Sequence, residues 1–126
     1  MPKKPTRKTL VKNLDKVFSE WIRRRYAKND IAECVTCGKQ DHWKKLQAGH
    51  FMSRKFYATR WDEENVQVQC YACNVMRYGE QYKFSKWLGE EKSDELLTKS
   101  RQTVKFMDFE LQEKINYFKA LLNDLN

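Results

Sequence analysis

Two C-x-x-C pairs, Cys34/Cys37 and Cys70/Cys73, constrain this chain more than any other feature of its sequence. Four thiolates in two close pairs are the usual ligands of a tetrahedral structural zinc ion, whereas iron–sulfur clusters, redox thiols and unrelated buried cysteines are the alternatives. We predict zinc, which would hold the two pairs together and fix the 32 residues between them. His42 is a further candidate ligand, but its polar surroundings favour a surface position.

Length and composition indicate the number of domains and the class of the protein. The 126 residues fit one domain, in which a structural metal would add considerably to a modest core. A hydrophobic content of 40% with 13% aromatic residues is typical of a folded chain, and no apolar run is long enough to span a membrane. The basic N-terminus also lacks the apolar stretch of a signal peptide. We therefore expect a cytoplasmic protein, in which paired cysteines bind metal rather than form disulfides.

The formal charge of +8 is concentrated at the N-terminus. Residues 1–29 contain ten lysines and arginines but only two acidic residues, while residues 30–126 contain fifteen of each. Such a basic segment suits a polyanion, because neutralised phosphates release condensed counterions. A solubilising tail with a solvated helix face explains the same charge, so charge alone leaves nucleic-acid binding open.

Hydrophobic periodicity predicts a largely helical chain with one pair of strands. After a flexible basic arm at 1–8, an amphipathic helix is expected over Thr9–Lys28, with Thr9 as its cap. Strands are expected within 46–52 and 66–69, on either side of a loop at 53–65. Short helices are expected over 74–79, 81–88 and 93–100, followed by a final helix with apolar positions at Leu111, Ile115, Phe118, Leu122 and Leu125.

The apolar seam of the final helix has two interpretations. It is shorter than the three to four heptads that indicate a coiled coil, which favours packing on its own domain. An apolar stripe must be buried against something, however, and a symmetric homodimer is the alternative.

Two groups of arginines are candidate DNA contacts. Arg23, Arg24 and Arg25 lie in the last turns of the first helix, where cations also stabilise the helix dipole. Arg54 and Arg60 lie in the loop between the strands, where a guanidinium can grip a phosphate, although ordinary surface charge explains them equally well.

His50 and Asn74 carry the other chemistry that the pattern suggests. A zinc ion bound by the two cysteine pairs would hold His50, near the end of one strand, facing Asn74 at the start of a helix. Neutral imidazole is a general base near pH 7, and an amide oxygen suits Mg²⁺. Together they would serve phosphodiester hydrolysis, with the base activating water and the metal stabilising charge on the phosphate. One histidine and one asparagine alone are weak signals, and a core histidine is the simpler interpretation.

Longer motifs add a family resemblance. The segments Ala48–Phe51, Thr59–Val66 and Gln69–Asn74 resemble the NinG/Rap family of phage recombination endonucleases. The order of C-x-x-C, Gly-His, Asn and C-x-x-C-N is similar to that of zinc-bound HNH, or His-Me finger, nucleases. The similarity covers about Leu14 to Leu125.

The resemblance implies a role for three residues. His50 takes the position of the general base, Asn74 that of the ligand to a catalytic Mg²⁺ or Mn²⁺ ion, and Asn65 that of the residue whose side chain holds the loop. Many HNH nucleases place a metal-binding Asp directly before the base, but this chain has Gly49. We therefore expect a loosely held, hydrated metal.

The expected fold is α+β and mostly helical. It comprises a single domain over 9–126, with a zinc-stabilised ββα-metal core at about 34–79 and helices on both sides, those of the C-terminus over about 80–126. The expected function is a metal-dependent DNA endonuclease, acting on branched DNA such as Holliday junctions, in a phage or prophage protein of the bacterial cytoplasm. The alternatives are a general HNH nuclease or nickase and a non-catalytic zinc module that binds nucleic acid.

Overall fold

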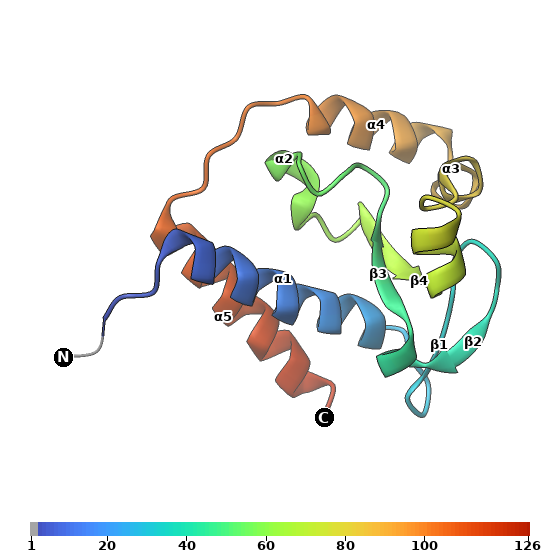
Figure 1. The fold of residues 1–126 in the computed structure, drawn as a ribbon, viewed down its shortest axis with the longest axis horizontal. Helices are drawn as coiled ribbons and strands as arrows, with labels where there is room; N and C mark the ends of the chain where they lie inside the picture. The colour runs from blue at the N-terminus through green and yellow to red at the C-terminus, as the bar shows by residue number, and fades with distance from the viewer. Residues whose placement is uncertain (1–2) are drawn as a thin grey trace.

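The computed structural model describes residues 3–126 as a mostly helical α+β fold with two small sheets (Figure 1). Met1 and Pro2 of the predicted basic arm lie outside the described residues. The elements in chain order are α1 (Arg7–Arg24), β1 (Ile31–Glu33), β2 (Gln40–His42), η1 (Trp43–Lys45), β3 (Gln47–His50), α2 (Tyr57–Arg60), β4 (Val66–Gln69), η2 (Ala72–Met76), α3 (Gln81–Leu88), α4 (Glu90–Ser100) and α5 (Asp108–Asp124).

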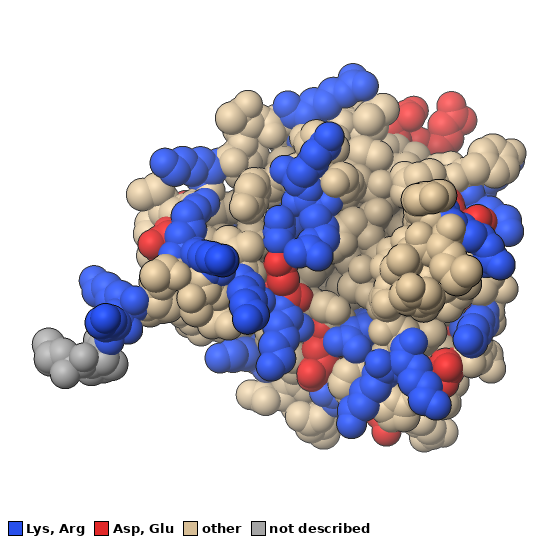
Figure 2. All heavy atoms as spheres, viewed as in Figure 1, with Lys and Arg blue, Asp and Glu red and all other residues tan. Residues whose placement is uncertain are grey.

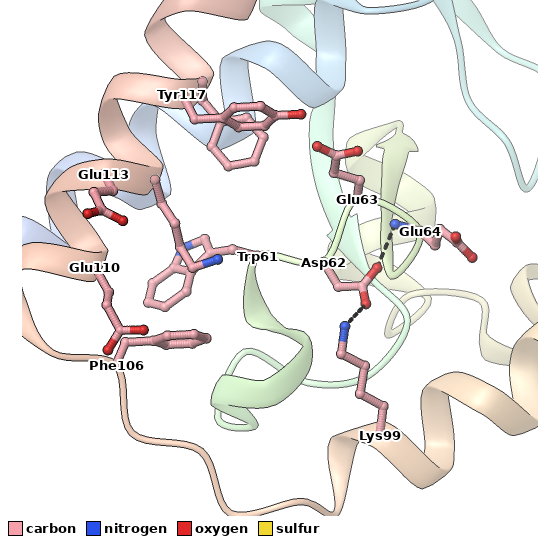
Figure 3. A pocket seen from close by; sticks show the side chains of 11 residues that line it. Trp61, Asp62, Glu63, Glu64, Lys99, Phe106, Glu110, Glu113 and Tyr117 are labelled. Carbon is pink, nitrogen blue, oxygen red and sulfur yellow. Dashed lines mark hydrogen bonds and ion pairs between the residues drawn. The ribbon is translucent and has the colours of Figure 1, made fainter.

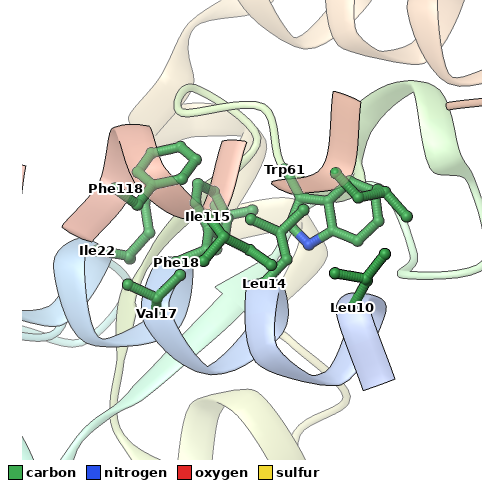
Figure 4. Close-up of a cluster of buried hydrophobic side chains, with 10 residues drawn as sticks. Leu10, Leu14, Val17, Phe18, Ile22, Trp61, Ile115 and Phe118 are labelled. Carbon is green, nitrogen blue, oxygen red and sulfur yellow. The ribbon is translucent and has the colours of Figure 1, made fainter. Parts of the chain in front are cut away.

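The main core lies between the first and last helices, which cross side by side although they are far apart in the chain (Figure 1). Side chains at helical spacing on α1 pack against α5, and Trp61 and Val66 complete the same cluster (Figure 4). The two phenyl rings of Phe18 and Phe118 meet edge to face, with centroids 4.9 Å apart. The α1 residues buried in this core are Leu10, Leu14, Val17, Phe18 and Ile22.

Both ends of α1 differ from the prediction. The Thr6 side chain accepts a hydrogen bond from the Thr9 backbone N–H, so Thr6 rather than Thr9 caps the helix. The helix ends at Arg24 instead of Lys28. Asn29 and Asp30 have φ values of 51° and 64°, a left-handed conformation that turns the chain into β1.

The first cysteine pair lies in a β-hairpin that the sequence did not predict. Strands β1 and β2 are antiparallel, with Ala32 opposite Asp41, and the turn between them contains Cys34, Cys37 and Gly38. The φ of Gly38 is +81°, as expected for a glycine that permits a tight turn. Both strands have only three residues, and every residue of β2 is polar, so neither strand shows an alternating hydrophobic pattern.

The second hairpin agrees with the predicted strand pair. Strands β3 and β4 are antiparallel, with Gln47 opposite Gln69 and His50 opposite Val66. The intervening loop contains one short helix, α2. Beyond β4, the predicted helix at 74–79 is a single π-helical turn over Ala72–Met76, so Asn74 lies in its middle rather than at its start.

The helices of the C-terminal half agree with the prediction, except that α4 begins at Glu90, three residues before the expected Ser93. The predicted seam of α5 is mostly used within the chain, because Leu111, Ile115 and Phe118 are buried against α1. This part of the seam is therefore not free to serve as a dimer interface. No helix among residues 3–126 is long and apolar enough to cross a membrane.

Candidate functional site

The four cysteines converge at one point between the two hairpins. Their sulfur atoms all lie within 4.8 Å of one another, and Cys37 Sγ is 3.6 Å from Cys70 Sγ. A zinc tetrahedron with bonds of about 2.3 Å places its sulfurs about 3.8 Å apart, so the arrangement can hold a zinc ion. The Val35 N–H donates to the Val68 carbonyl, which ties the first cysteine turn to β4. His42 is not part of the cluster; its Nδ1 accepts from the Lys44 N–H instead.

The environment of Cys34 favours its thiolate form. Burial by itself raises the pKa of this thiol, but hydrogen bonds from the Thr36 side chain and from backbone groups outweigh burial and lower the pKa to about 6. A zinc ligand must be deprotonated, and these donors stabilise that form.

His50 is held by a backbone carbonyl of the loop. Its Nε2 lies 2.9 Å from the Arg60 carbonyl oxygen, and because a carbonyl only accepts, Nε2 carries the proton. Nδ1 is then the basic nitrogen, and no hydrogen bond from the described residues reaches it. Burial is the largest cause and lowers the pKa of His50 to about 4. The charges of Arg54 and Arg60 also lower this pKa, while the hydrogen bond to the Arg60 carbonyl and the charge of Asp15 raise it without offsetting burial. The imidazole is therefore neutral at pH 7.

Asn65 ties both ends of the loop that follows β3. Its Nδ2 donates to the carbonyls of Met52, at 3.1 Å, and Thr59, at 2.9 Å, while its Oδ1 accepts from the Met52 N–H at 2.7 Å. The side chain is fully buried and its hydrogen-bonding groups are engaged. The Thr59 carbonyl is one residue from the carbonyl that orients His50, so Asn65 helps to position that histidine through the backbone.

Asn74 is oriented by a glutamine that the sequence did not single out. The Asn74 Nδ2 donates to Gln47 Oε1 at 2.7 Å, and the Asn74 backbone N–H donates to the Cys70 carbonyl at 2.9 Å. The Oδ1 of Asn74 accepts no hydrogen bond among the described residues. Gln47 belongs to β3, where alternation places its side chain on the same face as Gly49 and opposite to His50. The structure therefore ties the predicted ligand, in η2, to β3 through Gln47, on the face opposite to the His50 side chain, and no hydrogen bond among the described residues joins Asn74 to His50.

Asp15 is a second residue that the sequence did not single out. Its Oδ1 accepts from Trp61 Nε1 at 2.9 Å and its carboxylate accepts from Arg60 Nε and Nη2 at 3.1 and 2.6 Å. Hydrogen bonding and the charge of Asp15 raise the pKa of Arg60. The sequence carried one signal for this role, since Asp15 is one of two acidic residues in the basic first 29 positions.

The five arginines that were predicted to contact DNA differ in how many hydrogen bonds and ion pairs they form within the chain. Arg60 is bound by Asp15, and Arg25 donates to the Val66 carbonyl and Gln67 Oε1. Arg24 pairs with Glu20, and Arg23 donates to Ser19. Arg54 touches Asp15 at 3.3 Å, but its side chain is 62% exposed, so its guanidinium is the most available of the five.

Lysine and arginine side chains are spread widely over the face that carries α1, with fewer acidic side chains between them (Figure 2). A pocket of about 550 Å³ lies between residues 61–64 of the loop before β4, the end of α4 and α5 (Figure 3). Its lining includes five acidic residues, Asp62, Glu63, Glu64, Glu110 and Glu113. Lys99 and Lys114 also line the pocket, and Lys99 pairs with Asp62, but the acidic residues outnumber them, which is unfavourable for a phosphate backbone.

Comparison with known proteins gives one match. The family model described as the bacteriophage lambda NinG protein matches residues 3–126. No curated protein and no solved structure matches the chain. The family match spans both hairpins, the four-cysteine cluster and all five α-helices. The chain therefore belongs to the NinG family.

Proposed function

We propose that this protein is a metal-dependent DNA endonuclease of the HNH, or His-Me finger, type, in which β3, β4 and η2 form the ββα-metal core. The observation that carries the proposal is the state of His50. Its proton is on Nε2, its Nδ1 is free, and its low pKa keeps it neutral at physiological pH. A neutral imidazole with one fixed N–H and one free lone pair is ready to accept a proton from an attacking water.

The amide groups near η2 fit a divalent ion. Gln47 holds the side-chain nitrogen of Asn74, and the carbonyl oxygen of that amide accepts no hydrogen bond within residues 3–126. Amide oxygens are hard ligands that suit Mg²⁺ or Mn²⁺, and water fills the remaining positions of such sites. When bound, the ion would stabilise negative charge on the phosphate and on the departing 3′ oxygen.

The charge around His50 suits a phosphodiester. Arg54 lies in the loop that follows β3, and its side chain is mostly exposed. It can therefore contact a phosphate that approaches His50. An anionic phosphate beside His50 would also raise the pKa of the imidazole from its low starting value, which strengthens it as a base. The basic residues of α1 extend the contact surface beyond the site.

Branched DNA is the substrate that the family resemblance favours. Resolution of a four-way junction requires two incisions on opposite strands, and one chain offers one site. Two copies would supply both sites. Because Leu111, Ile115 and Phe118 are buried against α1, such a dimer would use a surface other than the central part of the α5 seam.

The test compares cleavage with binding. The zinc-loaded protein is incubated with four-way junction, nicked duplex and linear duplex of equal length, with and without Mg²⁺. We expect Mg²⁺-dependent paired incisions near the branch, and His50→Ala should abolish them while DNA affinity in band-shift assays changes little.

The chain's other histidine provides a matched control. His42→Ala removes an imidazole of the other hairpin, at the end of β2, which accepts from the Lys44 N–H, and this variant should cleave like the parent protein. Equal cleavage by His50→Ala and the parent would contradict the proposed base. Binding by the parent without any cleavage under all divalent ions would favour the non-catalytic zinc module, and scattered cuts on linear duplex would favour a general nuclease.

A further inference from the structure

Gly49 leaves a gap in the proposed metal site, because it lacks the carboxylate that many HNH nucleases place directly before the base. The structure fills this space with another side chain. A Cβ atom at position 49 would lie only 1.8 Å from Gln69 Oε1 and 2.6 Å from Gln69 Cδ. Gln69 enters from β4, where it lies opposite Gln47, the residue that orients Asn74. Its amide therefore occupies the place in which a side chain at position 49 would begin.

The oxygen of this amide is unpaired in the part of the chain that the structure describes. Gln69 is fully buried, and its Oε1 accepts no hydrogen bond among the described residues. Its Nε2 donates to the Gly79 carbonyl at 2.9 Å and to Thr36 Oγ1 at 3.1 Å. Because a carbonyl only accepts, the contact with Gly79 fixes the nitrogen on that side and the oxygen on the side of Gly49. A buried unpaired acceptor is unfavourable unless something binds it.

We propose that Gln69 supplies the second protein ligand of the divalent ion, so that its Oε1 replaces the carboxylate missing at position 49. This inference rests on the proposed function. The ion would be held by two neutral amide oxygens, from Asn74 and Gln69, which come from η2 and β4. Neutral oxygens bind Mg²⁺ and Mn²⁺ more weakly than carboxylates do, which agrees with the loosely held metal that the sequence predicts.

The test measures metal binding without reference to cleavage. Mn²⁺ is titrated into the zinc-loaded protein, and free Mn²⁺ is followed by electron paramagnetic resonance. Gln69→Ala should weaken Mn²⁺ binding on the order of tenfold or more, because it removes a ligand. Gln69→Glu should tighten it, since a carboxylate is the better ligand. The double variant Gly49→Asp with Gln69→Ala should restore affinity, because the smaller residue 69 makes room for the carboxylate.

Gln67→Ala is the matched control. Gln67 lies two residues away on the same face of β4, but its Oε1 already accepts from Arg25. This variant should bind Mn²⁺ like the parent protein, and zinc content and thermal stability are measured for every variant.

The outcomes separate this inference from the function on which it rests. If Asn74→Ala binds Mn²⁺ as tightly as the parent, the proposed metal site fails. If Asn74→Ala loses Mn²⁺ but Gln69→Ala and Gln69→Glu both keep the parent affinity, the site stands and Gln69 is only a structural residue. A folded Gln69→Glu protein that binds Mn²⁺ more weakly than the parent would also overturn the inference, because a structural role predicts damage without any gain.

Discussion

The core between α1 and α5 buries ten apolar side chains, whereas the cluster between the hairpins buries six residues, three of which are cysteines. The first region has enough leucine, isoleucine and phenylalanine to be stabilised by removal of apolar surface from water. The second contributes only Ala32, Leu46 and Val68 as aliphatic side chains. Its strands of three and four residues would be marginal without a metal. The region with the candidate chemistry is thus the one whose small core would gain most from a metal ion on the four cysteines.

Loss of a zinc ligand should have the largest effect. Cys73 is fully buried, and Cys73→Ser should release the ion and unfold the region of both hairpins, because zinc binding contributes on the order of 10 kcal/mol to such folds. Metal analysis and thermal unfolding would measure this. His42→Ala should keep one zinc per chain. A Cys73→Ser protein with parental stability and metal content would show that the cysteines are not zinc ligands.

Truncation in the helical core should cost less and leave the metal in place. Phe118→Ala should reduce the free energy of unfolding by about 3–5 kcal/mol, since a buried aromatic side chain is replaced by a cavity. Urea denaturation would measure this, with zinc content unchanged. Leu125→Ala, at a position 40% exposed, is the control and should change stability by less than about 0.5 kcal/mol. Zinc loss in Phe118→Ala would mean that the cysteine cluster is not stable independently of the core between α1 and α5.

Removal of Asp15 tests the junction between the two regions. Asp15→Ala leaves Trp61 Nε1 and the Arg60 guanidinium without their acceptor, which should destabilise the protein by about 1–3 kcal/mol. Asp124→Ala changes an exposed carboxylate on α5 and should be neutral. Chemical denaturation of both variants measures the difference, and equal stability would remove Asp15 as a link between α1 and the loop.

Low pH should reduce the free energy of unfolding through protonation of His50, which lies in the β3–β4 hairpin. Its pKa is about 4 in the folded state, below the ordinary value of about 6.5 in an unfolded chain. Below pH 6.5 the unfolded chain binds a proton that the folded chain does not, so stability is complete above pH 6.5 and falls toward pH 4. Between pH 7.5 and 5.5, the parent should lose about 1 kcal/mol more than His50→Gln.

Proton NMR in a His42→Ala background reports the His50 signal directly. The His50 resonance should show no titration between pH 7.5 and 5.5 if burial holds the ring neutral. A midpoint near pH 6.5 would contradict the low pKa.

The sequence predicted those parts of the fold that depend on local pattern. The helical spacing of Leu14, Phe18, Leu111 and Ile115 placed both core helices, and the alternation around Val66 and Val68 placed β4. The three-residue strands β1 and β2 escaped prediction because their pairing depends on the cysteine turn between them. The sequence predicted that a helix forms here more accurately than it predicted where the helix begins, as the N-cap at Thr6 instead of Thr9 shows.

The candidate site was predicted less completely, because its geometry depends on contacts between distant residues. His50, Asn65 and Asn74 stand in motifs that suggest a role for each of them. Gln69 is the first residue of the segment Gln69–Asn74 but nothing in that pattern gave it a role, and Gln47 lies outside the quoted segments. Their importance comes from the β3–β4 register, which sets them opposite each other and leaves Gln69 against the bare backbone of Gly49. No local pattern encodes such a pairing.

The packing of α5 on α1 has a consequence for the order in which the chain can fold during synthesis. The cysteine pairs are complete once Cys73 has left the ribosome, so the hairpins, and any metal ion that the cysteines hold, can assemble early. The apolar stripe of α1, by contrast, meets its partner only after Leu111, Ile115 and Phe118 have emerged. Such distant contacts form slowly, and the uncovered stripe is exposed to aggregation until then. A nascent chain paused after α4 should therefore bind chaperones through α1, and completion of α5 should release them.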